Sequence, residues 1–294
     1  MDAIEPGPNI TFELIEYAAS MPDRPALALP GRDFGYRDLN ALAWRSAQYL
    51  HDQGVRRGDV VALTFMNEFL LALAILGVAR LGATTLSIPR SATPVQRLEW
   101  ARIARCRLLV SDTPQRFDAG VPAIAFGGSD LGSGRRIDTG ILDEHPSAPC
   151  SIAVGSGSTG RPKLIPITHA QMRGRCGLAA VDPAYGRDSR ALYLSNLEFA
   201  SIQTYFFCVL HLGACFVLAD HAQADLAGFC MRRSVTLLQV SVFHAESLLR
   251  SLPQADGPRF PRLEALRIGG SMVTDDLRAR MRQGLSEKLV VGYG

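Results

Sequence analysis

Hydrophobic residues follow two alternating patterns along this chain. Between residues 38 and 53, apolar side chains recur every three or four positions, which predicts a helix that ends at Gly54. The uninterrupted apolar run at residues 60–63 then predicts a buried strand. The pair Thr93–Pro94, a capping hydroxyl followed by a proline, predicts the start of another helix. Strand and helix therefore alternate from the first third of the chain onwards.

The same patterns continue to the end of the sequence. Further helices are predicted over residues 67–81, 202–212, 226–233, 243–252 and 275–284. Further strands are predicted over residues 83–88, 107–110, 150–154, 191–194, 214–218, 235–240, 263–268 and 288–291. Strands joined through single helices by short connections pair in parallel. We therefore expect an α/β fold of largely parallel sheets flanked by helices, in two βα subdomains at residues 1–188 and 189–294.

Bulk composition narrows the class of protein. Of the 294 residues, 47% are hydrophobic and 20% are charged, which is typical of a soluble globular protein. A net charge of +3 and an aromatic content of 7% do not favour nucleic acid as a partner. The uncharged run 199–219 is long enough to cross a membrane, but it contains Gln203 and His211 and is broken by Gly213. We interpret it as a buried helix followed by a buried strand, and we expect no membrane span.

Cysteine and histidine residues show no spacing that suggests chemistry. The six cysteines include no C-x-x-C pair, which is typical of reduced core thiols in a cytoplasmic protein. The six histidines are scattered and form no metal-binding pair, so we expect no metal site within the chain. His169 follows Thr168 at a predicted helix start, where we expect a surface or capping role.

The most informative segment follows the predicted strand 150–154 and reads Ser-Gly-Ser-Thr-Gly-Arg-Pro-Lys, residues 156–163. Gly157 and Gly160 let the backbone approach a ligand closely, while consecutive loop amides can surround an anion. Hydroxyl donors come from Ser156, Ser158 and Thr159, and a compact positive charge comes from Lys163. The spacing differs from that of a Walker loop. We interpret the segment as a polyphosphate-binding loop; the alternative is a flexible Ser/Gly linker.

This segment resembles the signature [ST]-S-G-[ST]-T-G-x-P-K-G of the AMP-forming adenylating enzymes. That superfamily includes acyl- and aryl-CoA synthetases, adenylation domains of peptide synthetases and luciferases. The chain departs from the signature at Gly155, where the family has a hydroxyl residue, and at Leu164, where it has glycine. The resemblance implies the N-terminal part of the adenylating-enzyme fold, without the C-terminal domain.

Two later segments also match the family. The double glycine in Gly269-Gly270-Ser271 resembles a segment that runs along the adenine and the acyl group; on its own it could equally be a tight turn. Residues Tyr293 and Gly294 resemble the start of the family's Tyr-Gly-x-Thr-Glu, whose tyrosine packs on adenine. In parallel sheets, ligands bind where loops leave the carboxyl ends of strands. We therefore expect both segments to lie near the phosphate-binding loop.

Residues 194–199 stand where the family has its acyl-pocket gate. Asn196, Glu198 and Phe199 are the acyl-pocket candidates. A carboxylate at Glu198 would disfavour a carboxylate substrate unless it points away or is paired.

The resemblance implies activation of a carboxylic acid by ATP to an acyl-adenylate and pyrophosphate, followed by transfer to coenzyme A or a phosphopantetheine carrier. It assigns catalytic roles to Lys163 and Thr159, with an acyl carrier protein as a possible partner. The expected Mg²⁺ ligand, a glutamate, would follow Gly294, so we interpret the chain as a truncated gene product or N-terminal fragment, inactive alone. The alternative is a non-catalytic homologue that binds nucleotide or acyl groups. The sequence identifies neither the acid nor the acceptor.

Overall fold

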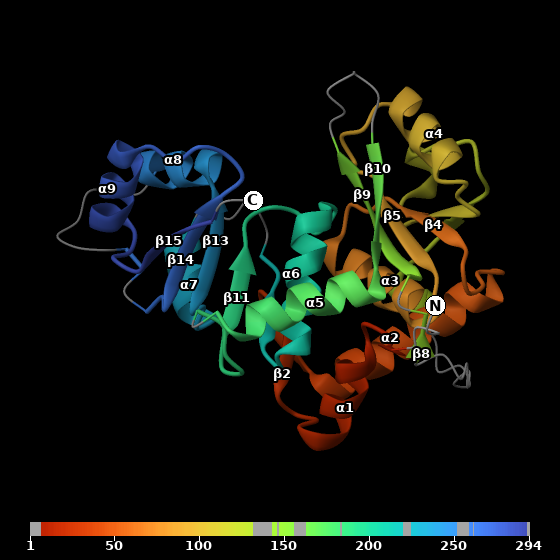
Figure 1. The fold of residues 1–294 in the computed structure, drawn as a ribbon, viewed down its shortest axis with the longest axis horizontal. Helices are drawn as coiled ribbons and strands as arrows, with labels where there is room; N and C mark the ends of the chain where they lie inside the picture. The colour runs from red at the N-terminus through yellow and green to blue at the C-terminus, as the bar shows by residue number, and fades with distance from the viewer. Residues whose placement is uncertain are drawn as a thin grey trace, which may run out of the picture.

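The computed structural model describes residues 7–131, 143–145, 147–155, 163–182, 184–219, 225–251, 259–260 and 262–292. Within these residues the chain forms two lobes, each built on a sheet with helices packed against it (Figure 1). The predicted α/β class with largely parallel sheets is confirmed.

The first sheet has the order β10-β9-β5-β4-β6-β7. Its strands are β4 (Val60–Leu63), β5 (Thr84–Ser87), β6 (Leu108–Ser111), β7 (Ala123–Ala125), β9 (Pro149–Gly155) and β10 (Lys163–Thr168). All described neighbours pair in parallel except β9 and β10, which form an antiparallel hairpin. A separate antiparallel pair joins β1 (Gly7–Pro8) to β8 (Asp143–Glu144).

The second sheet has the order β15-β14-β13-β11-β12-β2-β3. Its strands are β2 (Pro25–Leu29), β3 (Arg32–Gly35), β11 (Arg190–Tyr193), β12 (Cys215–Val217), β13 (Leu237–Ser241), β14 (Ala265–Gly269) and β15 (Leu289–Val291). Only β2 and β3 pair in antiparallel among the described neighbours. The division at residue 188 stays a prediction, and this sheet extends across it because the early hairpin β2–β3 lies beside β12.

Helices pack against both sheets. They are α1 (Phe12–Ser20), α2 (Tyr36–Asp52), α3 (Glu68–Arg80), α4 (Pro94–Ile103), α5 (His169–Ala180), α6 (Ala200–His211), α7 (Leu226–Arg232), α8 (Val242–Ser251) and α9 (Asp275–Gly284). Two short 3₁₀ turns cover Pro114–Arg116 and Gly128–Asp130. The predicted start of α4 is confirmed, because Thr93 caps the helix and exchanges hydrogen bonds with Gln96.

The uncharged run 199–219 forms α6 and β12, as predicted, and both elements are largely buried. None of the helices in the described ranges is long and apolar enough to cross a membrane.

Helices α2 and α3 pack closely at Gly77. The Ser46 hydroxyl on α2 donates to the Leu73 carbonyl on α3 at 2.7 Å, which brings the two backbones together. A methyl group at Gly77 would lie 2.9 Å from the Ser46 carbonyl carbon, so this contact needs a glycine. Gly174, on the exposed side of α5, has open space around the same position.

We expect Gly77→Ala to lower the free energy of unfolding by about 1–3 kcal/mol, because the added methyl forces the two helices apart. Gly174→Ala is the matched control, and it should leave stability unchanged or raise it by up to about 1 kcal/mol through helix propensity. Urea unfolding of both variants measures the difference. Equal effects at the two glycines would show that the contact between α2 and α3 is not tight.

A half-buried ionic cluster joins α1, α5 and α6. The Arg173 guanidinium donates to the Glu13 carboxylate at 3.0 Å, and the His211 Nδ1 atom lies 3.2 Å from the same carboxylate. Burial raises the pKa of Glu13, but the contacts with His211 and Arg173 outweigh it and lower the pKa to about 2. Glu13 therefore stays ionised inside the protein.

The expected surface or capping role of His169 is wrong. Its side chain is 2% exposed, and its Nδ1 atom accepts a hydrogen bond from the Ile10 amide at 3.1 Å, whereas Thr168 caps α5. Burial, together with the charges of Arg57 and Arg173, lowers the pKa of His169 to about 4. The N-terminal segment folds over this helix start, which the local sequence did not reveal.

Because both pKa values are lowered in the folded protein, the free energy of unfolding decreases as the pH falls. The His169 contribution should be complete above its unfolded pKa of 6.5 and be lost as the pH falls towards 4, because only the unfolded state gains a proton there. The Glu13 contribution should be complete above pH 4.5 and be lost as the pH falls towards 2. Urea unfolding between pH 7.5 and about pH 4 tests the first range. His169→Gln should flatten that slope, and an unchanged slope in this variant would contradict the assignment.

Candidate nucleotide and acid site

The β9–β10 hairpin carries the predicted phosphate-binding loop. Lys163, the first residue of β10, pairs across the hairpin with Gly155, the last residue of β9, so the two strands close the base of the loop. The Lys163 side chain is exposed to solvent. The predicted phosphate ligands between them lie outside the described residues: Ser156, Gly157, Ser158, Thr159 and Gly160. Their roles stay predictions.

The double glycine lies against the segment that leads to Tyr293. A methyl at Gly269 would lie 3.0 Å from the Gly292 carbonyl oxygen, and the Gly292 amide donates to the Ile268 carbonyl at 2.8 Å. Gly270 has φ +89°, a conformation that side-chain-bearing residues rarely adopt. The two glycines are therefore needed for different reasons, close approach at one and backbone conformation at the other.

The remaining residues of these two segments are only partly described. Ser271 is exposed beside the double glycine. Tyr293 and Gly294 lie outside the described residues, and their predicted contact with adenine stays a prediction. The parallel pairing of β14 with β15 nevertheless brings the ends of both strands to one edge, as the sequence led us to expect.

The acyl-pocket candidates lie between β11 and α6. Glu198 is 8% exposed, and its carboxylate accepts from the Arg90 amide at 3.1 Å and from the Asn196 side chain at 3.4 Å. The Arg90 guanidinium also forms an ion pair with it, at 3.7 Å from Nε. Phe199, next in sequence, is 47% exposed. The negative charge of Glu198 is thus paired, and the ring beside it is open to solvent.

This loop also connects the two sheets. Arg90 follows β5 of the first sheet, and Glu68 at the start of α3 accepts a hydrogen bond from the Leu197 amide at 3.1 Å. The Arg90 guanidinium donates in addition to the Met66 carbonyl at 3.2 Å. Side chains from the ligand edge of the first sheet therefore hold a loop that leaves the ligand edge of the second.

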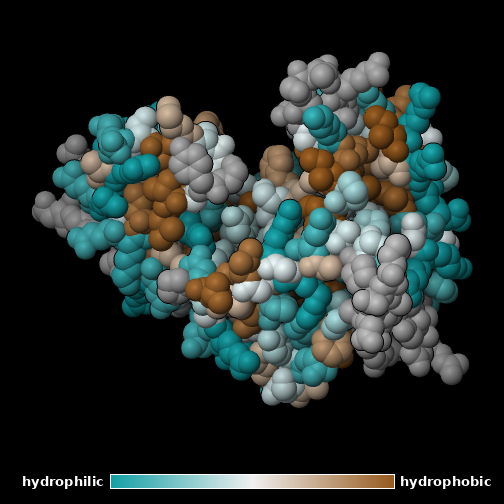
Figure 2. All heavy atoms as spheres, viewed as in Figure 1, coloured by the Kyte–Doolittle hydropathy of each residue, from teal (hydrophilic) through white to brown (hydrophobic). Residues whose placement is uncertain are grey.

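The carboxyl ends of the two sheets open on the same side of the molecule. Figure 1 shows β9 and β11 pointing the same way, and β13 and β14 run parallel to β11. Figure 2 shows the surface hollowed between the two lobes on that side. The ends of the strands that lead into the predicted loops thus face one hollow.

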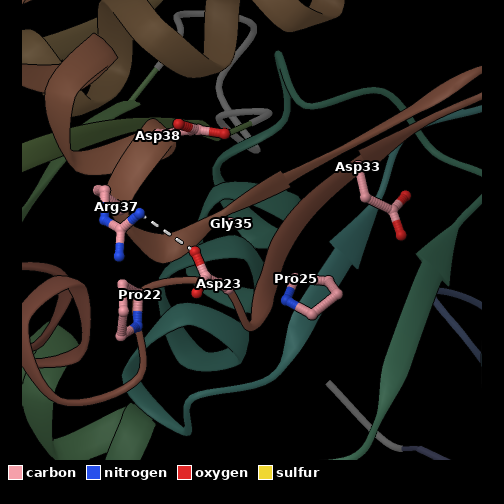
Figure 3. A pocket seen from close by; sticks show the side chains of 7 residues that line it. All are labelled: Pro22, Asp23, Pro25, Asp33, Gly35, Arg37 and Asp38. Atoms are coloured by element: carbon pink, nitrogen blue, oxygen red, sulfur yellow. Dashed lines mark ion pairs between the residues drawn. The ribbon is translucent and has the colours of Figure 1, made fainter.

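A separate cavity of about 200 Å³ lies elsewhere, where β2 begins and β3 ends (Figure 3). It is lined by Pro22, Asp23, Pro25, Asp33, Gly35, Arg37 and Asp38. Because β2 runs parallel to β12, this is the opposite edge of the second sheet from the double glycine. Its ion pair, Asp23 with Arg37 at 3.2 Å, joins two exposed side chains. The cavity contains none of the predicted site residues.

Among the side chains that the structure describes, no group of three or more His, Cys, Asp or Glu residues could hold a metal ion.

Comparison with known proteins decides the family. The sequence matches the family model described as AMP-binding enzyme over residues 14–294. The chain belongs to the AMP-binding enzyme family.

A sequence relative and two solved structures are consistent with this family. The chain is 32% identical over 281 residues to CymA of Salinispora arenicola, a probable non-canonical nonribosomal peptide synthetase. This alignment covers 91% of the chain and 4% of CymA. The N-terminal subdomain of Klebsiella oxytoca NpsA, in complex with 3-hydroxybenzoyl-AMSN, superposes with a TM-score of 0.84 at 22% identity, over 98% of this chain and 73% of that one. O-succinylbenzoate coenzyme A synthetase (MenE) of Bacillus subtilis, in complex with AMP, superposes with a TM-score of 0.81 at 21% identity, over 97% of this chain and 72% of that one. The chain spans a small part of the curated relatives it matches.

Sequence reasoning missed Arg90 and Glu68 as contacts of the loop that carries the acyl-pocket candidates. The available signal was position, because Arg90 comes directly after Ile88-Pro89 at the carboxyl end of a predicted strand. Nothing in the local pattern identified Glu198, more than a hundred residues later, as its partner. Only the packing of the two lobes brings them together.

We expect Glu198→Ala to lower the free energy of unfolding by about 1–3 kcal/mol, because the Arg90 amide and guanidinium lose their acceptor. Glu287→Ala removes an exposed glutamate and should change stability by less than about 0.5 kcal/mol. Urea unfolding of the two variants side by side provides the measurement. A cost at Glu198 no larger than at Glu287 would mean that the ion pair does not hold the loop.

Proposed function

We propose that this chain forms the nucleotide- and acid-binding part of an enzyme that activates a carboxylic acid with ATP. The acid's carboxylate oxygen attacks the α-phosphorus of ATP, the bond to the bridging oxygen breaks, and pyrophosphate leaves. The products are an acyl-adenylate and pyrophosphate. A thiol then attacks the acyl carbon and AMP leaves, which makes the enzyme an acid–thiol ligase.

The observation that carries this proposal is the arrangement of strand ends in a member of the AMP-binding enzyme family. The strands that lead into the phosphate-binding loop and the double glycine end on the same side of the molecule. Both segments lie at carboxyl ends of strands, where ligands of such sheets bind. A nucleotide between them would reach the phosphate loop with one end and the double glycine with the other.

On the phosphate side, the proposed ligands are the loop amides and the hydroxyls of Ser156, Ser158 and Thr159, with Gly157 and Gly160 shaping the loop. Lys163 would place its charge near the leaving pyrophosphate, where negative charge grows during the reaction. Its exposed position at the base of the hairpin leaves it free for such a contact. Lys163 and Thr159 are accordingly the proposed catalytic residues.

On the other side, the proposed contacts with adenine and the acyl group come from Gly269, Gly270, Ser271, Tyr293 and Gly294. The open position at Gly270 supports this, because no described atom lies within 4 Å of where its side chain would begin. The acid would lie near Asn196, Glu198 and Phe199. Because Glu198 is paired with Arg90, its charge no longer opposes a carboxylate substrate.

The proposed acceptor is a thiol, of coenzyme A or of a carrier's phosphopantetheine. The likeness to a peptide synthetase at 32% identity favours a carrier protein, whereas the likeness to the coenzyme A synthetase MenE at 21% shows the fold alone. Mg²⁺ stays an expectation of the resemblance, and no residue of this chain is assigned to it. A cytoplasmic location belongs to the same proposal, supported by the free thiols of the six cysteines.

The test is acid-dependent ATP–pyrophosphate exchange by the full-length protein that contains this chain, across a panel of carboxylic acids. We expect at least one acid to support exchange. Lys163→Ala should lower its rate at least tenfold, which corresponds to about 1.4 kcal/mol of transition-state stabilisation. Lys288, the other lysine of the chain, is exposed in the second lobe. Lys288→Ala is therefore the control, and it should leave the exchange rate unchanged.

The opposite outcomes are equally clear. Nucleotide binding without exchange for any acid would support the non-catalytic alternative. Exchange that is unchanged in Lys163→Ala would remove this lysine from the mechanism. Adding coenzyme A or a phosphopantetheinylated carrier to the active protein then identifies which thiol accepts the acyl group.

A further inference from the structure

Gln203 is a polar residue in the buried face of an apolar helix. It lies on α6, which is located between the two sheets (Figure 1) and contacts both β9 and β12. Its side chain is 1% exposed, and its helix neighbours Phe206 and Phe207 are buried as well. A buried amide destabilises the fold unless its hydrogen-bonding groups are satisfied, so packing alone does not account for a glutamine at this position.

Three hydrogen bonds satisfy the Gln203 amide, and each goes to a different segment. Its Nε2 atom donates to the Ser87 hydroxyl at 2.5 Å and to the Leu197 carbonyl at 3.1 Å. Its Oε1 atom accepts from the Ser151 hydroxyl at 3.2 Å. All three partners are buried. One side chain therefore holds the end of β5, the strand β9 and the loop of residues 194–199, here named the acid loop, in a fixed arrangement.

These segments are the ones whose relative placement the proposed reaction needs. Ser151 lies on the strand that ends at Gly155, where the phosphate loop begins. Leu197 lies between Asn196 and Glu198 in the acid loop. In-line attack requires the carboxylate and the α-phosphorus to be held close and aligned, and a misplacement of about 1 Å can cost on the order of 100-fold in rate.

We infer that Gln203 is a positioning residue that sets the distance between the phosphate loop and the acid loop. This inference rests on the proposed function. None of its three hydrogen-bond partners is a predicted ligand-binding residue; Gln203 acts through Ser151 on one side and Leu197 on the other. The three directional hydrogen bonds allow only one arrangement of the segments, whereas an apolar side chain of the same size would allow them to slide.

The test is a double-mutant cycle in the full-length protein, read by ATP–pyrophosphate exchange. Gln203→Met keeps the volume and removes the hydrogen bonds, and we expect it to lower kcat about tenfold with KM for ATP within about twofold. Ser151→Ala should lower kcat about threefold, and in the Gln203→Met background it should cost nothing more. Thr204→Val is the matched control, because that hydroxyl donates to Ala200 in the same helix and accepts from Arg175 of α5, and so bonds to neither loop.

A second readout does not depend on activity. Gln203→Met should speed amide hydrogen exchange in residues 149–155 and 194–199 while the Thr204→Val control leaves both unchanged. Unchanged exchange in those segments, or losses of kcat that multiply in the double variant, would overturn the inference. If the wild-type protein shows no ATP–pyrophosphate exchange with any acid of the panel, the proposed function is overturned, and the catalytic effect of Gln203 with it. The amide hydrogen exchange result still decides whether Gln203 couples the two loops.

Discussion

The structure depends on holding the ligand edges of two separate sheets in one arrangement. Each sheet has its own strand order, but a shared site needs the edges of both sheets at fixed positions. Helix α6 and the loop before it meet this need, because they belong to the second lobe and bond to the first. The ion pair of Arg90 with Glu198 closes the same connection nearer the surface.

Polar contacts suit this task better than apolar packing. Burying apolar surface favours association without specifying geometry, whereas a buried hydrogen bond is lost if either partner shifts. The cluster of Glu13, Arg173 and His211 adds further directional contacts, which join α1, α5 and α6. The two lobes share one apolar core, which includes Val61 of the first sheet and Tyr193 of the second, and the directional contacts of α6 fix the geometry within it.

The chemistry of the site lies on loops, while the scaffold determines where they begin. Lys163 and Gly155 close the base of the phosphate-binding hairpin, and the pairing of β14 with β15 brings Gly269 against Gly292. Such an arrangement is common, since loops can vary in chemistry without changing the strands that carry them. Membership of the AMP-binding enzyme family is consistent with this division between scaffold and loops.

The sequence by itself determined the α/β alternation, the capped start of α4 and the special glycines, because periodicity, capping and backbone freedom are local properties. Only the tertiary structure decided that β9 and β10 form an antiparallel hairpin, that β2 joins the second sheet, and that His169 is buried. It also decided that Arg90 pairs with Glu198. Each of these depends on which distant segments meet, and strand pairing and ion pairs across long separations leave no periodic trace in the chain.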